Sequence, residues 1–392
     1  MCDVPALRFP EFTGEWERHK LSEVCSFYSG GTPSSSKKEY YNGNIPFIRS
    51  GELHKDYTEL FITEAGLSNS AAKLVETGDL LLALYGATSG DIAISKIKGA
   101  INQAILCIRT KQNKKFIESV WNKHVERLLQ TYLQGGQGNL SADIVKNIPF
   151  YFANSNEQDK LAKFISLLDE RIATQNKIIE KYESLIQAMC DTLVEQETQQ
   201  VTLSFSDFGQ SYLGLSGKSA EDFGEGYPFI TYMNVYQNQI IDLTDVGLVK
   251  INETEQQSVV RYGDILLTLS SETPEEVGMG AVYLGETYPL YLNSFCFGIH
   301  ITDESKIYPP FLAYYVSSQS FRKAVYPLAQ GSTRFNLQKS DFMKKKFSFP
   351  VIEKQRKIYS TLKTYSDKLI VEKQIMRLLC NQKCYLLRQL FI

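Results

Sequence analysis

The chain has 392 residues, of which 43% are hydrophobic and 22% are charged, and its formal net charge is −2. This is the composition of a globular protein with enough material for two or more hydrophobic cores. No apolar run reaches the ~18 residues that a membrane span needs, so we expect no membrane partner. The near-neutral charge means that a nucleic acid would be met by local patches or by a basic companion subunit.

The seven cysteines are scattered along the chain without a C-x-x-C pair. Their odd number and wide spacing are typical of a reducing compartment, and we expect each to be a small buried apolar residue. Met1 leads into "CDVPALRFPEF" without a long apolar run, so the sequence predicts a cytoplasmic protein. The four histidines show no metal-like spacing with each other or with cysteine, so no metal site is expected.

The first half of the chain opens with a strand-rich segment. Short apolar runs between glycines predict strands at 79–86, 91–97 and 104–110, and the stretch 115–133 predicts a helix. The glycine-rich "QGGQGN" follows and runs into "LSADIVKN", an arrangement that often binds phosphate. Its echo at 330–341 carries a single glycine, which argues against a phosphate cradle.

A long helix is predicted from residue 161 onward, because its apolar positions alternate in steps of four and three. At ~1.5 Å rise per residue, the segment 161–193 makes a rod on the order of 50 Å long. Its seam consists of Leu161, Ile165, Leu168, Ile172, Gln175, Ile179, Tyr182 and Ile186.

The second half repeats the order of elements found in the first. Strands are predicted at 264–270, 281–286 and 295–301, and a helical stretch at 309–328. The matching positions include Asp79 with Asp264, Asn139 and Leu140 with Asn336 and Leu337 (336 − 139 = 197), and Gln158 with Gln355 (355 − 158 = 197). A repeat of this length means one architecture built twice.

The second long helix carries the same seam, with a polar residue at the equivalent place. Its members are Ile358, Leu362, Tyr365, Leu369, Glu372, Met376 and Leu379. A single polar layer costs stability but fixes register, so Gln175 and Glu372 are expected to meet near the middle of an antiparallel pair. The alternative is two unrelated amphipathic helices, each lying on its own domain.

Several motifs resemble those of enzymes but lack an essential residue. "GLSGKS" has Tyr212 where a phosphate loop needs its first glycine. "YPPF" has Tyr308 where an amino-methyltransferase needs Asp or Asn to accept from the amine of the base. No convincing Ser/His/Asp set is found. We therefore expect no catalytic residue in this chain.

Together these features resemble a known family. The motifs are "PALRFPEFTGEWERHKLSEVCSFYSGGTPSSS", "GNIPFIRSGEL", "GDLLLALYGATSG", "INQAI" and "GQGNLSADIVKNIPF", with "GYPFITYMNV", "GDILLTLSS" and "FPVIEKQRKI" in the second half. Over nearly all of its length the chain resembles the specificity (S) subunit of Type I restriction-modification enzymes. The second half departs from the first, since it lacks a clear "GGTPS" and has "SSETPEEVG" for "YGATSG".

The resemblance implies an α+β fold with an internal pseudo-twofold repeat. Two similar strand-rich recognition domains, 1–154 and 200–350, would be separated by two long antiparallel coiled-coil helices, 155–199 and 351–392. Each domain would read one half of a bipartite site in double-stranded DNA. The helices would dock two methyltransferase (M) subunits, and restriction (R) subunits would join them. This chain would hold no cofactor, because S-adenosylmethionine and ATP with Mg would bind the partner subunits.

Base edges need forked side chains, and phosphates accept from Lys, Ser, Thr and loop amides. The DNA-binding candidates of the first domain are Thr32, Ser34, Ser35, Lys37, Lys38, Arg49, Tyr85, Thr88, Ser89 and Gln137. Those of the second are Ser211, Tyr212, Lys218, Tyr232, Ser270, Ser271, Thr333 and Arg334. The alternative for each is an ordinary solvated loop residue. Asn102 and Asn293 stand at a strand start in both copies, which favours a framework role.

Two other functions stay open at this point. The first is a coiled-coil scaffold that binds proteins without DNA specificity. The second is a stand-alone DNA adenine methyltransferase, against which the missing donor and catalytic motifs argue.

Overall fold

A computed structural model describes residues 4–132, 139–286 and 288–392 of the chain. The chain divides into two compact units, residues 1–176 with 374–392 and residues 177–373. Each unit therefore combines one strand-rich domain with a part of each long helix.

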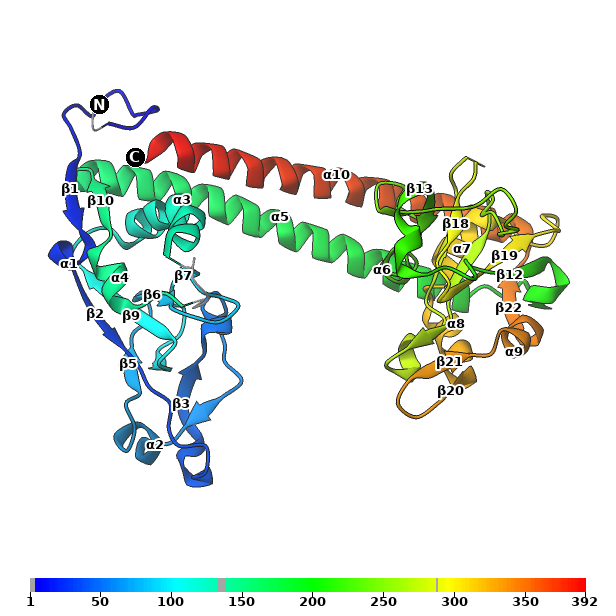
Figure 1. Ribbon diagram of the computed structural model, residues 1–392, viewed down its shortest axis with the longest axis horizontal. Helices are drawn as coiled ribbons and strands as arrows, with labels where there is room; N and C mark the ends of the chain where they lie inside the picture. The colour runs from blue at the N-terminus through cyan, green and yellow to red at the C-terminus, as the bar shows by residue number, and fades with distance from the viewer. Residues whose placement is uncertain (1–3, 133–138, 287) are drawn as a thin grey trace. The chain divides into compact units, whose positions relative to one another are not determined.

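The first unit is built on two four-stranded sheets and a strand pair (Figure 1). One antiparallel sheet has the order β2-β9-β6-β7, and its central strand β6 is buried at all four residues, as a strand covered on both faces must be. The second has the order β4-β3-β8-β5, with β3 parallel to β8. The strands are β1 Glu17–Lys20, β2 Cys25–Ser29, β3 Tyr41–Ile48, β4 Phe61–Ile62, β5 Lys73–Val75, β6 Leu80–Ala83, β7 Ile92–Ile94, β8 Gly99–Ile101, β9 Ile105–Thr110 and β10 Pro149–Phe152.

The helices of this domain are α1 Leu21–Val24, α2 Glu64–Ser68, α3 Lys114–Tyr132 and α4 Ala142–Asn147. The helix expected at 115–133 is thus confirmed over its described residues. Part of the glycine-rich loop lies outside the described residues, but α4 follows it. Ser141 caps α4, since its hydroxyl accepts from the backbone N–H of Ile144.

The second unit repeats the main sheet arrangement of the first with a different sequence. Its main antiparallel sheet has the order β12-β19-β15-β17, and its β13 runs parallel to β18 as β3 does to β8. The strands are β11 Gln200–Ser204, β12 Gly209–Leu213, β13 Phe223–Ile230, β14 Val246–Val249, β15 Ile265–Thr268, β16 Ser270–Ser271, β17 Gly280–Val282, β18 Tyr291–Leu292, β19 Cys296–Ile301, β20 Ala329–Gln330, β21 Phe335–Leu337 and β22 Lys346–Pro350.

The helices of the second domain are α6 Tyr232–Gln237, α7 Pro309–Tyr315, α8 Gln319–Val325 and α9 Lys339–Lys344. The single helical stretch expected at 309–328 is therefore wrong in detail. It breaks between α7 and α8 because the Ser318 hydroxyl accepts from the N–H of Phe321 and starts a new helix.

The two long helices are α5 Ser155–Glu195 and α10 Ile352–Leu390. In the first unit, Leu161 and Ile165 near the start of α5 pack in one core with Leu387 and Leu390 near the end of α10. In the second unit the opposite ends meet, with Cys190 and Val194 of α5, and Ile358 and Leu362 of α10, in one core. The helices are therefore antiparallel, as predicted.

Every position of the predicted seam is buried or half-buried, which confirms the heptad pattern. Gln175 is buried and Glu372 is half-buried. Their meeting in one polar layer stays a prediction. The alternative of two unrelated helices, each lying on its own domain, is wrong, because residues of both helices share the core of each unit.

Backbone hydrogen bonds show that the two domains share one framework. In the first domain the N–H of Leu84 donates to the carbonyl of Ala104 at 2.8 Å, and the N–H of Leu140 donates to Leu84 at 2.7 Å. In the second, Leu269 donates to Phe295 at 2.8 Å, and Leu337 donates to Leu269 at 2.8 Å. The repeat found in the sequence is therefore a repeat of structure.

Gln158 and Gln355, the joint glutamines, connect each domain to its long helix in the same way. The side-chain carbonyl of Gln158 accepts from the N–H of Asn113 at 3.1 Å, and its amide donates to the carbonyl of Ala153 at 2.7 Å. The carbonyl of Gln355 accepts from Tyr308 at 2.8 Å, and its amide donates to Pro350 at 2.8 Å. Both side chains are buried, so each acts as an internal strut between helix and domain.

Candidate nucleic-acid interface

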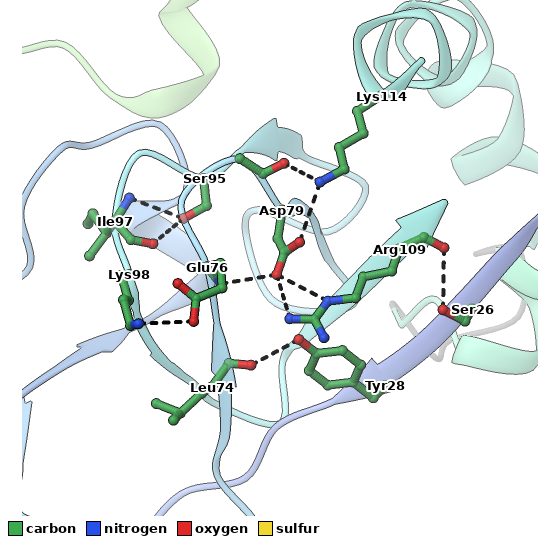
Figure 2. Close-up of polar contacts among 11 residues, drawn as sticks. Ser26, Tyr28, Leu74, Glu76, Asp79, Ser95, Ile97, Lys98, Arg109 and Lys114 are labelled. Carbon is green, nitrogen blue, oxygen red and sulfur yellow. Dashed lines mark hydrogen bonds and ion pairs between the residues drawn. The ribbon is translucent and has the colours of Figure 1, made fainter. Parts of the chain in front are cut away.

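A buried carboxylate ties together the sheet of the first domain (Figure 2). Asp79 accepts from Nη2 of Arg109 at 2.9 Å and from the backbone N–H of Glu76 at 3.0 Å, and Nζ of Lys114 lies 3.4 Å from its other oxygen. The ring of Tyr28 lies 5.1 Å from Cζ of Arg109. Burial alone raises the pKa of Asp79, but the bond from Arg109 and its neighbours outweigh burial, so the pKa lies below its ordinary value.

The second domain places Asp264 at the equivalent position with different partners. Asp264 accepts from the hydroxyl of Tyr212 at 2.8 Å and from the N–H of Arg261 at 2.8 Å, and Nδ1 of His300 lies 2.8 Å from its other oxygen. The rings of Tyr212 and His300 are stacked with centroids 4.2 Å apart. Burial, followed by the charge of Asp264, raises the pKa of Tyr212. Both networks fix the framework and leave the loops beyond the sheet to differ.

A second shared device holds the turn that precedes β9 and β19. Asn102 accepts from the N–H of Ala104 at 3.1 Å, and Asn293 accepts from the N–H of Phe295 at 2.9 Å. Each asparagine therefore closes an Asx turn with its own backbone. This confirms the framework role expected for Asn102 and Asn293.

The predicted contact residues at 32–38 lie together on one exposed loop of the first domain. Thr32, Ser34, Ser35, Lys37 and Lys38 are all exposed. The ammonium of Lys37 lies 5.0 Å from the ring centroid of Tyr40. The Thr32 hydroxyl donates to Gln103 and the Lys37 ammonium donates to the hydroxyl of Tyr40 at 3.0 Å, so Lys38 and Ser35 are the groups of this loop best suited to phosphate. DNA contact by these residues stays a prediction.

Arg49 is exposed, but its guanidinium is engaged inside the first domain. Nη2 lies 2.8 Å from Glu52 and 2.9 Å from Glu59. The neighbouring carboxylates, Glu52 first, raise the pKa of Arg49. Burial raises the pKa of Glu52, yet Arg49 and the backbone donors lower it to about 2. Two carboxylates therefore compete with a base for this arginine.

The loop after β6 carries Tyr85, Thr88 and Ser89, all of them half-buried. The hydroxyl of Ser89 donates to the carbonyl of Leu84 at 3.0 Å, so it is used by the loop itself. Gln137 lies outside the described residues. Contact of DNA by Tyr85, Thr88 and Gln137 stays a prediction.

In the second domain, Thr333 and Arg334 are exposed at the tip of the hairpin between β20 and β21. Cζ of Arg334 lies 5.6 Å from the ring centroid of Phe295, which stacks the cation on an aromatic face. Ser211 is half-buried, and Tyr232 is half-buried with its hydroxyl donating to the carbonyl of Ser270 at 2.8 Å.

Four of the predicted contact residues have side chains that are buried or almost fully buried, and DNA contact by them stays a prediction that their burial disfavours. Tyr212 is only 9% exposed and uses its hydroxyl on Asp264, and Ser270 and Ser271 are buried on the short strand β16. The side chain of Lys218 is 5% exposed and pairs with Glu255 at 2.5 Å. Tyr212, Ser271 and Lys218 use their side chains on carboxylates inside the domain, at Asp264, Glu276 and Glu255.

Two exposed aromatic residues were missed in the sequence. Tyr57 is 57% exposed with the ammonium of Lys55 5.0 Å from its ring centroid, and Phe295 is 54% exposed under Arg334. The signal for the first was an aromatic residue among charges in "LHKDYTE". The signal for the second was a large apolar residue where the other copy has Ala104.

No group of three His, Cys, Asp or Glu side chains is arranged to hold a metal ion within the described ranges. None of the helices that the structure describes is long and apolar enough to cross a membrane. Cys380 and Cys384 are exposed, so the expectation that every cysteine is buried is wrong for this part of α10.

Sequence comparison places these features among known proteins. The family model of the Type I restriction modification DNA specificity domain matches residues 13–184 and 214–379. The Type I restriction enzyme MjaVIII specificity subunit of Methanocaldococcus jannaschii is 22% identical, over 95% of this chain and 90% of that protein. The EcoR124I/EcoR124II specificity subunit of Escherichia coli is 27% identical, over 42% of this chain and 43% of that protein.

Solved structures show the same fold. The S subunit of a Type I restriction-modification system from M. genitalium has a TM-score of 0.56 and 16% identity, and the match covers 99% of both chains. A chain from a study of complex assembly and conformational transition in a Type I R-M system has a TM-score of 0.59 and 15% identity, over 95% of this chain and 96% of that chain. The two-domain arrangement with long helices is therefore one that solved S subunits also adopt.

Proposed function

The chain belongs to the family of Type I restriction-modification DNA specificity subunits, and we propose that its two domains read the two halves of an asymmetric bipartite DNA sequence. The observation that carries this proposal is the shared framework with unlike loops. Leu84 and Leu269 make equivalent backbone bonds, whereas the loops around them present different side chains. Two domains with the same backbone framework and different loop side chains are suited to reading two half-sites of different sequence.

The surfaces of the two domains differ in the chemistry they offer to DNA. The first domain exposes hydroxyls and ammonium groups at 32–38, and it neutralises Arg49 with carboxylates. The second exposes Arg334 on an aromatic ring. Ammonium and hydroxyl groups suit phosphate, and a guanidinium fork suits guanine, so the domains would contact DNA differently.

Catalysis in this proposal belongs to partner subunits. Two M subunits would dock on this chain and supply S-adenosylmethionine and the methylating residues, and R subunits would supply ATP- and Mg-dependent cleavage. The long helices α5 and α10 would hold the two domains at a set separation. Support comes from the family, and from a structural relative solved in work on complex assembly.

The test changes the helices and reads out the DNA sequence. One heptad is inserted into α5 after Asn176 and one into α10 after Lys373, which keeps the seam in phase on both helices. The matched control replaces seven exposed residues without insertion. Co-expressed with M subunits, the insertion variant is expected to methylate both original half-sites with a longer gap between them.

Altered half-sites with an unaltered gap would refute the spacer role. Methylation by the chain alone would instead show that it is a stand-alone methyltransferase. A complex that assembles but shows no preference among DNA sequences would show a protein scaffold. Methylation mapping on genomic DNA separates these outcomes.

A further inference from the structure

We propose that Arg334, seated on the ring of Phe295, reads a guanine in the half-site of the second domain. The inference rests on the proposed function and assigns one base contact within it. Phe295 acts as a positioning residue, because it holds the guanidinium and does not itself need to touch a base.

The backbone of Phe295 is fixed on both of its polar groups. Its N–H donates to Asn293 at 2.9 Å, and its carbonyl accepts from the N–H of Leu269 at 2.8 Å. The ring nevertheless stands 54% exposed, while the equivalent Ala104 of the first domain is buried. The backbone thus fixes the position of the ring, and the ring carries the Arg334 guanidinium on its face, so Phe295 acts as a platform for that cation.

Arg334 comes from another segment of the chain, the hairpin between β20 and β21. The hairpin tip begins at Gly331, whose φ of +136° suits glycine and lets the chain turn sharply. The guanidinium carbon lies 5.6 Å from the ring centroid. Stacking on a ring face leaves the N–H donors in the guanidinium plane free to bind.

Arg334 differs in its charged neighbours from Arg49, the arginine predicted to bind DNA in the first domain. Arg49 is held by Glu52 and Glu59, whereas Arg334 forms no ion pair with any carboxylate in the described part of the chain. An arginine held in place by a neutral ring keeps both its charge and its fork for a ligand. The ligand that matches two parallel N–H donors in the DNA major groove is guanine, through O6 and N7.

The experiment uses the full chain in complex with its M subunits and selects bound sequences from randomised duplexes. Arg334→Lys keeps the charge and loses the fork, and Phe295→Leu keeps an apolar side chain and loses the ring. Either variant is expected to lower the preference for guanine at one position of one half-site by about 5- to 150-fold. Phe295→Tyr is expected to retain the preference, and Ser332→Ala in the same hairpin serves as the matched control.

Each other outcome overturns the assignment. A uniform loss of affinity, with a salt dependence shallower by about one ion, would show that Arg334 binds a phosphate. A wild-type bipartite preference that survives both variants would overturn this inference and leave the proposed function standing. A wild-type complex without sequence preference would overturn the proposed function itself.

Discussion

The joint glutamines offer a direct measure of how each domain is fastened to its helix. Gln355→Ala removes the bonds to the N–H of Tyr308 and to the carbonyls of Pro350 and Lys306, and it leaves the first two groups facing an interior site. An unsatisfied buried group costs about 1–3 kcal/mol, so two of them cost about 2–6 kcal/mol. Water can enter the space left by the amide, so we expect about 3 kcal/mol. For a unit of this size, that lowers the unfolding midpoint by about 6–12 °C.

Gln158→Ala is expected to have the same effect on the other unit. It also removes the hydrogen bond that the side-chain amide of Gln158 donates to the side-chain carbonyl of Gln112 at 2.8 Å. Because the two glutamines belong to different units, the double variant should lower the stability of each unit as its own single variant does. Calorimetry measures the midpoints, and hydrogen exchange shows which unit opens. The matched control is Gln374→Ala, an exposed residue of α10, which should stay within about 0.5 kcal/mol of wild type.

The reasoning would be refuted if both joint variants unfolded together with the control. It would also be refuted if the loss from Gln355→Ala appeared in the first unit. Base preference is expected to be unchanged, because neither glutamine lies on an exposed loop.

Two further predictions follow from titratable groups. The folded pKa of Asp79 lies below its ordinary value of 3.8, so its ionised form stabilises the first unit at neutral pH and this contribution is lost as the pH falls below about 4. The difference in thermal midpoint between wild type and Asp79→Asn should therefore shrink from pH 5 to pH 2, and a constant difference would contradict it. Burial raises the pKa of Cys190 and Cys296 to about 12, so iodoacetamide at neutral pH should label the exposed Cys380 and Cys384 first. Peptide mass mapping checks the order, and equal labelling of Cys190 and Cys380 would contradict it.

The long helices and the repeat could be predicted from the sequence because each depends on a period. A heptad seam points one face inward whatever its partner is, and every predicted seam position is buried or half-buried. The matched spacing of Gln158 and Gln355 likewise marked two side chains that make equivalent bonds. Such patterns are properties of the chain itself and need no knowledge of tertiary contacts.

The loop residues could not be assigned in the same way. Ser270 and Ser271 form a strand of two residues, which is too short for an alternation to show which side faces inward. Lys218 forms an ion pair with Glu255, which lies 37 positions further along the chain (255 − 218 = 37). Conversely, Phe295 is exposed in a turn closed by Asn293, although Ala104 in the equivalent turn of the first domain is buried. Residue type alone therefore did not show which of these side chains are buried, nor that the Phe295 ring is exposed.

The spacing of the shared framework shows where the two domains diverge. The offsets between equivalent positions are 269 − 84 = 185, 295 − 104 = 191 and 337 − 140 = 197. The second domain thus has six more residues before Phe295 and six more after it, while the bonded positions at either end are unchanged. Of these six positions only Leu337 lies on a strand, β21, so the added chain changes the segments that connect the main strands. These longer segments contain Phe295 and Arg334, and Phe295 stands where the first domain has the buried Ala104.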